Sequence, residues 1–299
     1  MGSTPSRTFG SVGVAMATPF APDGSLDIES ARKLADHLVG EGVDLIVLSG
    51  TTGESPTTHQ PEKDELVTEV VAEVGDRAMV IAGAGSNDTA HGVRIAKGAA
   101  KCGAQGLLIV SPYYSRPSQE GIYQHITAIA ASTELPVMVY DIPGRTGVRI
   151  SAETFDRLAE NPKIKAVKDA VGDLPNGIAT SRRTGLEYYS GDDALNLPWL
   201  TIGGSGVVSV VGHIGGRRYR DMIDAVDAGD YAKAQQIDDE IHPLVNAIMG
   251  GGQGAVMAKE ALAMTGVIPH ATVRLPLVGA SQNELDSLRR VLQVQGYLN

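Results

Sequence analysis

Eight short apolar runs rich in β-branched residues recur along this chain, and stretches with helical periodicity separate them. The runs cover residues 12–17, 45–49, 79–84, 106–111, 137–141, 164–169, 188–191 and 206–211. They are apolar on both alternations, as expected for parallel strands that are covered outside by helices and filled inside by side chains. Eight strands of this kind close a (β/α)8 barrel. We therefore predict an α/β fold built on a (β/α)8 TIM barrel.

The stretches between the runs support this architecture. Their apolar residues recur at helical spacing, as in Ile28, Ala31, Leu34, Leu38 and Val39, and in Leu66, Val67, Val70, Val71 and Val74. Each set forms one helical face that could coat a barrel. The structural rival is a doubly wound open sheet, which usually carries a GxGxxG or GxxxxGK[ST] phosphate loop after a strand. Neither pattern occurs in the sequence, so the barrel is favoured.

The strand signals stop after about Gly229, and helical patterns follow at 230–249, 254–265 and 282–295. We therefore predict a catalytic barrel over residues 1–229 and a C-terminal helical region over residues 230–299. A chain of 299 residues accommodates one barrel, typically about 250 residues, together with such an appendage. Nothing in the appendage suggests catalysis.

The charge balance argues against some classes of partner. A formal net charge of −10 would repel nucleic acid and anionic membranes, and no long run of Lys or Arg reverses this locally. No apolar run approaches the roughly 18 residues that suggest a membrane span. The N-terminal MGSTPSRTFG lacks the apolar core of a signal peptide, and the single Cys102 cannot form an internal disulfide. We expect a cytoplasmic protein with no nucleic-acid partner and no membrane association.

Lys168 is the first candidate for a reactive group, because it lies among apolar residues near the end of a predicted buried strand, IKAVKDA. An ammonium group in apolar surroundings loses hydration, so its pKa falls and a neutral amine becomes available near neutral pH. Such an amine can form a Schiff base with a carbonyl substrate. The structural alternative is a lysine that bends into solvent or pairs with Asp169.

Polar groups also gather where other strands end, at the face on which (β/α)8 barrels place their active sites. The second run leads into SGTTGES at 49–55, whose hydroxyls and amides could hold a carboxylate. The fourth run delivers Tyr113 and Tyr114, and the fifth delivers Tyr140 followed by Arg145. Taken singly, the turn is ordinary and each tyrosine could simply pack its ring. Their conjunction favours a functional site.

Motifs for other chemistries are absent from the sequence. The seven histidines show no zinc-ligand spacing and no HExxH pattern, so we predict no metal site and no cofactor. There is no GxSxG nucleophile elbow, and Cys102 is best explained as a core filler. These observations disfavour a metal-dependent aldolase.

Six segments, in order and at matching spacing, resemble the dihydrodipicolinate synthase family over nearly the whole chain. They are GTTGES (50–55), PYYSRPSQEG (112–121), YDIPGRTG (140–147), VKDA (167–170), YSGDD (189–193) and RLPL (274–277). The resemblance implies a class I aldolase in a (β/α)8 barrel, usually a homotetramer built from tight dimers. It further implies condensation of pyruvate with aspartate 4-semialdehyde to 4-hydroxy-tetrahydrodipicolinate, which serves lysine and diaminopimelate synthesis.

The resemblance also assigns catalytic roles. Lys168 would attack the pyruvate ketone, and the iminium would act as the electron sink for loss of a methyl proton. Tyr140 would donate and accept protons near the imine. Thr51 and a Tyr114 donated by the neighbouring subunit would relay protons to solvent, which makes the dimer interface part of the site.

Four further residues are implied to bind substrate. Thr52, with nearby backbone amides, would hold the pyruvate carboxylate. Arg145 would hold the carboxylate of the incoming semialdehyde. Gly191 and Val208 would line the pyruvate pocket.

The chain departs from the family at the effector site of members that lysine inhibits. Asn87 and Tyr113 match that site, but Gln60 and Lys63 occupy positions where histidines stand, and His91 replaces a glutamate. The carboxylate that would face the ammonium of lysine is lost, and Lys63 adds like charge. We predict weak or absent inhibition by lysine.

Two alternative functions remain at this stage. A sibling lyase, such as an N-acetylneuraminate lyase or a 2-keto-3-deoxy-sugar acid aldolase, would use the same pyruvate imine with another aldehyde. Siblings generally lack the arginine of YDIPGRTG and the paired tyrosines, so Arg145 argues against them. A catalytically inactive paralogue is the other alternative, because a fold alone does not fix function.

Overall fold

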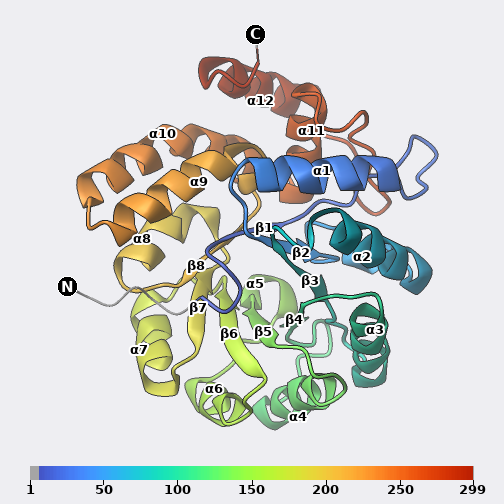
Figure 1. Ribbon diagram of the computed structural model, residues 1–299, viewed down its shortest axis with the longest axis vertical. Coiled ribbons are helices and arrows are strands. Elements are labelled where there is room, and N and C mark those ends of the chain that lie inside the picture. Colours follow the sequence, from blue (N-terminus) through green and yellow to red (C-terminus); the bar gives the residue numbers. More distant parts are fainter. Residues whose placement is uncertain (1–6, 299) are drawn as a thin grey trace.

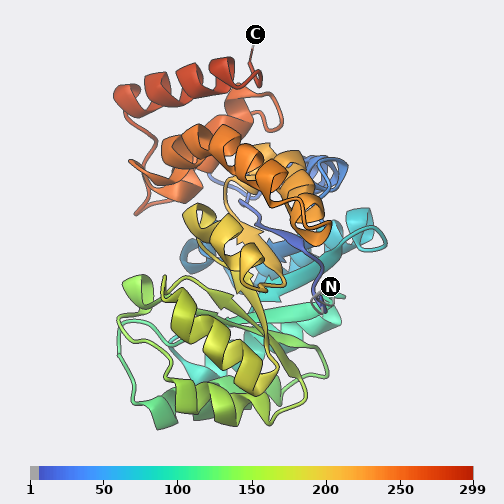
Figure 2. The same cartoon turned by 90° about the vertical axis from the view of Figure 1, so that its left-hand side faces the viewer.

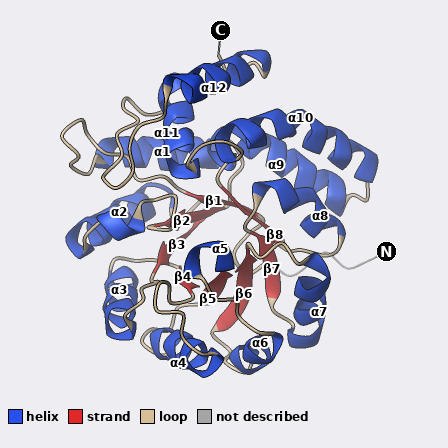
Figure 3. Cartoon of the chain, turned by 180° about the vertical axis from the view of Figure 1, so that it is seen from behind, coloured by secondary structure: helices blue, strands red, loops and turns tan. Residues whose placement is uncertain are grey.

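Eight parallel strands close into a barrel in the computed structural model, which describes residues 7–298 (Figures 1 and 3). The strands are β1 (Val12–Ala15), β2 (Leu45–Leu48), β3 (Met79–Gly83), β4 (Gly106–Val110), β5 (Val137–Asp141), β6 (Ile164–Asp169), β7 (Glu187–Ser190) and β8 (Gly206–Ser209). Each pairs with its neighbours in sequence, and β8 pairs with β1 to complete the closure. The predicted (β/α)8 barrel is confirmed, and most strands end just before the turns that carry the site.

Helices surround the barrel and continue past it as a C-terminal group. They are α1 (Ile28–Gly40), α2 (Gln60–Val74), α3 (Thr89–Lys101), α4 (Gln119–Ala130), α5 (Pro143–Thr146), α6 (Ala152–Ala159), α7 (Leu174–Thr184), α8 (Asn196–Thr201), α9 (Gly212–Asp227), α10 (Tyr231–Met249), α11 (Gly254–Met264) and α12 (Gln282–Val294). Two short 3-10 turns, η1 (Ser55–Thr57) and η2 (Asp193–Leu195), follow β2 and β7. Side-chain oxygens of Asp27, Asp88, Ser118, Ser151 and Asp173 accept backbone N–H groups at five helix starts, which fixes where those helices begin.

The core has two layers. An outer layer lies between strands and helices, and it buries Leu34 and Leu38 of α1 as the helical spacing predicts. An inner layer fills the barrel with Phe9, Ala15, Leu45, Val47, Ile81, Leu108, Met138, Tyr140, Ala166, Tyr189 and Val208. Side chains two positions apart on a strand share a face, so Lys168 points inward above Ala166. It therefore stands where the packed interior meets the mouth of the barrel.

The C-terminal helices form a group at one end of the molecule (Figure 2). Helix α10 packs along α9, and α11 and α12 pack on α10 and on each other. The predicted appendage is confirmed, while its exact boundary at residue 229 stays a prediction. Among residues 7–298, no helix is both long and apolar enough to cross a membrane. Residues 1–6, the start of the segment judged unlike a signal peptide, lie outside the described residues.

Candidate active site

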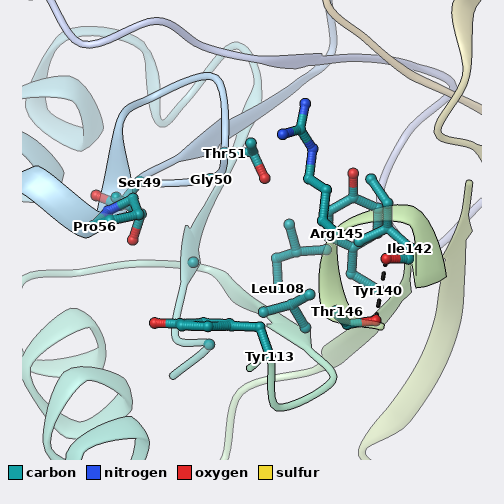
Figure 4. A pocket seen from close by; sticks show the side chains of 14 residues that line it. Ser49, Gly50, Thr51, Pro56, Leu108, Tyr113, Tyr140, Ile142, Arg145 and Thr146 are labelled. Carbon is teal, nitrogen blue, oxygen red and sulfur yellow. Dashed lines mark hydrogen bonds between the residues drawn. The ribbon is translucent and has the colours of Figure 1, made fainter. Parts of the chain in front are cut away.

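Two adjoining pockets open at the C-terminal ends of the strands. The inner pocket, of about 70 Å³, is lined by Ala15, Gly50, Thr51, Thr52, Leu108, Tyr140, Ile142, Arg145, Lys168, Gly191, Val210, Met249, Gln253, Gly254 and Ala255. The outer pocket, of about 250 Å³, shares Thr51, Tyr140 and Arg145 with it (Figure 4). The predicted residues Lys168, Tyr140, Thr51, Thr52, Arg145 and Gly191 are thus brought together around one small cavity.

Lys168 is buried without a carboxylate partner. Only 4% of its surface is exposed, and within residues 7–298 it forms no ion pair, so it neither bends into solvent nor pairs with Asp169. Its Nζ lies 4.5 Å from the centroid of the Tyr140 ring, on the adjacent strand. Its pKa is lowered to about 8, chiefly by burial; Asp193 opposes this shift, and Arg145 contributes to it. A neutral amine is therefore accessible near physiological pH.

Tyr140 and Arg145 reach the pocket from the end of β5. Tyr140 is paired with Lys168 in the sheet and is 5% exposed, and burial raises the pKa of its hydroxyl, so the phenol keeps its proton at neutral pH. Arg145 lies on α5, a single helical turn that Thr146 steadies by donating its hydroxyl proton to the Ile142 carbonyl at 3.1 Å. Arg145 and Thr51 both line the outer pocket (Figure 4). A phenol and a guanidinium therefore border the space in front of the amine.

The turn after β2 is unusually constrained. Ser49 and Glu54 bracket it with left-handed backbone, at φ 52° and 53°, which is uncommon for residues other than glycine. The hydroxyl of Thr18 donates to the Gly53 carbonyl at 2.7 Å. A Cβ on Gly83 would lie 2.3 Å from the Ser49 carbonyl oxygen, so the adjacent strand needs glycine there. This packing holds the two threonines of the turn against the pocket.

Gly191 makes room for the lysine. A Cβ at this position would lie 2.9 Å from both Cε and Cγ of Lys168 and 2.9 Å from the Asp169 carbonyl oxygen. Val208, also predicted to line the pocket, instead packs in the inner core layer, and Val210 lines the cavity. The difference follows from strand geometry, because Val208 faces the barrel interior below the cavity while Val210 lies beyond the end of β8.

Tyr113 and Tyr114 have different environments. Tyr113 is half-buried and lines the outer pocket. Tyr114 is 90% exposed and has a left-handed backbone, with φ 73°. Within this chain it does not line either pocket at the barrel mouth. Its role as a residue donated across a subunit interface stays a prediction.

Asp193 is a buried carboxylate for which the sequence suggested no role. It is 4% exposed and accepts hydrogen bonds from the Tyr219 hydroxyl and the Val210 amide, each at 2.9 Å, and from the Ser209 hydroxyl. It thereby ties η2 to the end of β8. The sequence signal was present as the second aspartate of YSGDD, but its partners on β8 and α9 are distant in the chain.

The C-terminal region also borders the site, which corrects the expectation that nothing there concerns catalysis. Met249, Gln253, Gly254 and Ala255 line the cavity that contains Lys168. Gln253 caps α11, because its Oε1 accepts the amides of Ala255 at 2.7 Å and Val256 at 3.2 Å. Helical periodicity could not predict this placement, because it indicates which face of a helix is buried but not which part of the protein that face contacts.

A third pocket, of about 190 Å³, collects most of the predicted effector positions. Gln60, Lys63, His91 and Tyr113 line it, whereas Asn87 is exposed and does not. The Lys63 ammonium donates to the backbone carbonyl and the hydroxyl of Ser55, both at 2.8 Å. Burial lowers the pKa of Lys63 to about 8. The pocket lining includes no aspartate or glutamate among the described residues.

The remaining sequence candidates for chemistry lie elsewhere. Cys102 is half-buried and packs against the outer core layer, as expected of a filler. Within the described range, no group of three or more His, Cys, Asp or Glu side chains is arranged to hold a metal ion.

Comparison with known proteins gives consistent results. The model of the dihydrodipicolinate synthetase family matches residues 8–295. The 4-hydroxy-tetrahydrodipicolinate synthase of Corynebacterium aurimucosum is 52% identical over 97% of this chain and 96% of its own length. The dihydrodipicolinate synthase of Acinetobacter baumannii, solved with pyruvate, has a TM-score of 0.93 at 35% identity, covering 97% and 100% of the two chains. The Cyanidioschyzon merolae enzyme, solved with lysine bound, has a TM-score of 0.93 at 42% identity, covering 97% and 99%.

Proposed function

The chain belongs to the dihydrodipicolinate synthetase family, and on that premise we propose that its barrel mouth performs the synthase reaction through Lys168. The protein is a Schiff-base-forming lyase that condenses pyruvate with L-aspartate 4-semialdehyde. The product is 4-hydroxy-tetrahydrodipicolinate, an intermediate of lysine and diaminopimelate biosynthesis. The observation that carries the residue assignment is Lys168 itself, a buried amine that lines a small pocket and has no ion-pair partner among the described residues.

The chemistry at Lys168 follows from its environment. The neutral amine adds to the ketone carbon of pyruvate, and loss of water leaves a protonated imine. Its positive charge accepts the electron pair of a methyl C–H bond as the proton leaves, so the methyl carbon becomes an enamine nucleophile. That carbon then forms the new bond to the aldehyde carbon of the semialdehyde, whose oxygen takes up a proton. The amino group of the semialdehyde adds to the imine carbon and displaces the Lys168 amine, which closes the ring of the product and frees the lysine.

Proton transfers in this sequence need a group beside the imine. Tyr140 is suited to the task because its ring lies 4.5 Å from the Lys168 Nζ and its hydroxyl remains protonated. A positioned acid or base of this kind contributes about 10² to 10⁴ in rate. We assign Thr51 and a Tyr114 from the neighbouring subunit to the relay that connects Tyr140 to solvent.

The two substrates each present a carboxylate, and the site offers two places for them. Thr52 and the turn after β2 line the inner pocket together with Lys168, so Thr52 and the amides of the turn would hold the pyruvate carboxylate. Arg145 stands at the mouth, between the inner and outer pockets, where the second substrate enters. Its guanidinium would bind the semialdehyde carboxylate through two parallel hydrogen bonds.

We further propose a cytoplasmic homotetramer assembled from tight dimers. The exposed Tyr114 supports the dimer, because a tyrosine that is 90% exposed on a constrained backbone is well explained by burial against a partner. Light scattering measures the assembly, and a monomer at assay concentrations would contradict the proposed relay.

The deciding experiment combines turnover with trapping. Purified protein is assayed with pyruvate and aspartate 4-semialdehyde, and a parallel sample is reduced with borohydride in the presence of pyruvate and mapped by peptide mass. Turnover at about 1 to 10³ per second with the adduct on Lys168 supports the proposal. Trapping without turnover would redirect the search to another aldehyde, such as N-acetylmannosamine. Failure of both would indicate an inactive paralogue.

A further inference from the structure

The turn that carries Thr51 and Thr52 is held in place from the C-terminal region. It ends at Glu54, whose backbone is left-handed at φ 53° and ψ 42° and whose side chain is 1% exposed. A left-handed residue other than glycine costs free energy and persists only when its surroundings hold it. Here the carboxylate is held on both oxygens: Oε1 accepts from the Lys259 ammonium at 2.5 Å, and Oε2 accepts from the Arg274 amide at 2.9 Å.

Lys259 is the central group of this arrangement. It lies on α11, its side chain is 0% exposed, and its Nζ also donates to the Thr272 carbonyl at 2.7 Å. The same Nζ lies 4.1 Å from the centroid of the Phe20 ring, which comes from the loop after β1. One ammonium thus joins the β1 loop, the turn after β2 and the loop that precedes Arg274.

Stability alone does not account for a buried pair of this kind. Removing two charges from water carries a desolvation penalty that often exceeds their mutual attraction, and apolar replacements of similar volume are frequently as stable. The pair between Glu54 and Lys259 is fully desolvated, so a requirement for fixed geometry is the better explanation of it. The position of α11 indicates what this fixed geometry is for.

Helix α11 contributes one wall of the pocket around Lys168, and the turn after β2 contributes another. The first residues of α11, Gly254 and Ala255, line the inner pocket, and Lys259 follows on the same helix. Thr51 and Thr52, which precede Glu54 in the turn, line the same pocket. The ion pair is therefore a direct strut, that is, a rigid connection, between two elements that line the inner pocket.

We propose that Glu54 and Lys259 are positioning residues that set the spacing between these two pocket walls and thereby the fit of pyruvate. This inference rests on the proposed function, because it assigns pyruvate to the inner pocket. Neither residue lines that pocket, so both act through the backbone of the turn and of α11. Loss of the pair should weaken pyruvate binding more than it slows the chemical steps at Lys168.

The test compares three variants with the parent protein. Lys259→Met removes the ammonium; Glu54→Gln with Lys259→Met removes both charges and keeps an acceptor for the Arg274 amide. The control is Leu38→Ala, because Leu38 is buried near the end of α1, at the barrel face opposite the site. Its cavity lowers stability without altering either pocket wall. For each protein, kcat, KM for pyruvate and the pyruvate dependence of borohydride trapping are measured, together with the thermal midpoint.

We expect KM for pyruvate to rise by about tenfold or more in both variants that lack the Lys259 ammonium, with a smaller change in kcat. The control should keep a KM within about twofold of the parent although its thermal midpoint falls. The double variant keeps the test valid if Lys259→Met alone fails to fold. An unchanged KM in the folded double variant, or an equal rise in Leu38→Ala, would overturn the inference while leaving the proposed function intact. A parent that neither traps pyruvate nor turns over would overturn the proposed function and this inference together.

Discussion

Lys168 at the barrel mouth and Lys259 at the joint between α11 and the barrel occupy similar surroundings but differ in one respect. Both are buried, at 4% and 0% exposed, and each ammonium lies over an aromatic ring, Tyr140 at 4.5 Å and Phe20 at 4.1 Å. Burial lowers the pKa of both. Lys259 has the Glu54 carboxylate at 2.5 Å, whereas Lys168 has no ion-pair partner among the described residues.

The difference shows how one residue type serves two purposes. A carboxylate in contact keeps an ammonium charged and therefore unreactive, which suits a strut. Without that contact, desolvation favours the neutral amine, which suits a nucleophile. Burial is common to both lysines, so the partner and not the burial distinguishes the reactive amine from the structural one.

Removing the reactive amine should have the largest effect. Lys168→Met is expected to lower turnover by about 10³-fold or more, because no other amine of residues 7–298 lines the inner pocket. Its thermal midpoint should not fall, since an apolar side chain replaces an unpaired buried amine. Steady-state kinetics and a circular dichroism melt measure the two quantities. Retention of more than about a tenth of the parent activity would contradict the assignment.

Removing the hydroxyl of the ring beside Lys168 tests whether Tyr140 transfers protons at the imine. Tyr140→Phe keeps the aromatic contact and removes the hydroxyl, so turnover should fall by about 10² to 10⁴ while the protein stays folded. Borohydride trapping in the same variant separates imine formation from later proton transfers. Near-normal turnover would remove Tyr140 from the proposed mechanism.

Breaking the ion pair between Glu54 and Lys259 should instead lower the stability of the protein. Lys259→Met leaves the Glu54 carboxylate buried and unpaired, which should lower the free energy of unfolding by about 3 to 5 kcal/mol. Urea denaturation measures the free energy of unfolding of this variant and of Lys168→Met, and so compares the two lysines directly. The contrast between them fails if the two variants lose equal stability. Adding Glu54→Gln should recover much of the loss.

The rate of pyruvate trapping should depend on pH through the neutral fraction of Lys168. Because Lys168 has a pKa of about 8, its neutral fraction, and with it the rate of pyruvate trapping, should rise about tenfold per pH unit below that value and level above it. Its folded pKa is below the ordinary 10.5, so between about 8 and 10.5 the unfolded chain binds more protons and Lys168 makes stability rise with pH. Trapping rates measured across this range give the pKa. A pH-independent rate would contradict it.

Lys63 provides an intermediate case, and the effect expected from it is the smallest. Its ammonium is buried against two neutral oxygens of Ser55, in a pocket whose lining has no carboxylate to receive the ammonium of free lysine. Millimolar lysine should therefore change turnover by less than about twofold. An inhibition assay at saturating pyruvate tests this, and half-inhibition at sub-millimolar lysine would show that the pocket still binds the effector.

Much of the barrel mouth could be predicted from local sequence. Strand runs and their ends are encoded in short stretches, and the site residues Lys168, Tyr140 and Arg145 lie at or just past those ends. The barrel topology then brings them together, since every strand delivers its C-terminal end to the same face. Val208 shows the limit of this reasoning. It packs in the barrel interior, whereas Val210, two residues further along the chain, lines the cavity.

The joint between α11 and the turn could not be predicted in the same way. Glu54 and Lys259 are 205 positions apart, and neither local propensity nor periodicity indicates which distant side chain a buried charge will meet. Asp193 illustrates the same point, because its partners Ser209 and Tyr219 lie on other elements. Sequence patterns indicate that such residues are buried, and only the tertiary structure supplies their partners.

The strut between Glu54 and Lys259 also has an evolutionary consequence. Each partner is tolerable in the apolar interior only while the other is present, so the two positions are expected to change together in relatives. A chimera that joins the barrel of one relative to the C-terminal helices of another would inherit half of this pair from each parent. Such chimeras should be stable only when both parents have the same residues at positions 54 and 259. The barrel and its helical appendage are therefore expected to evolve together as one unit.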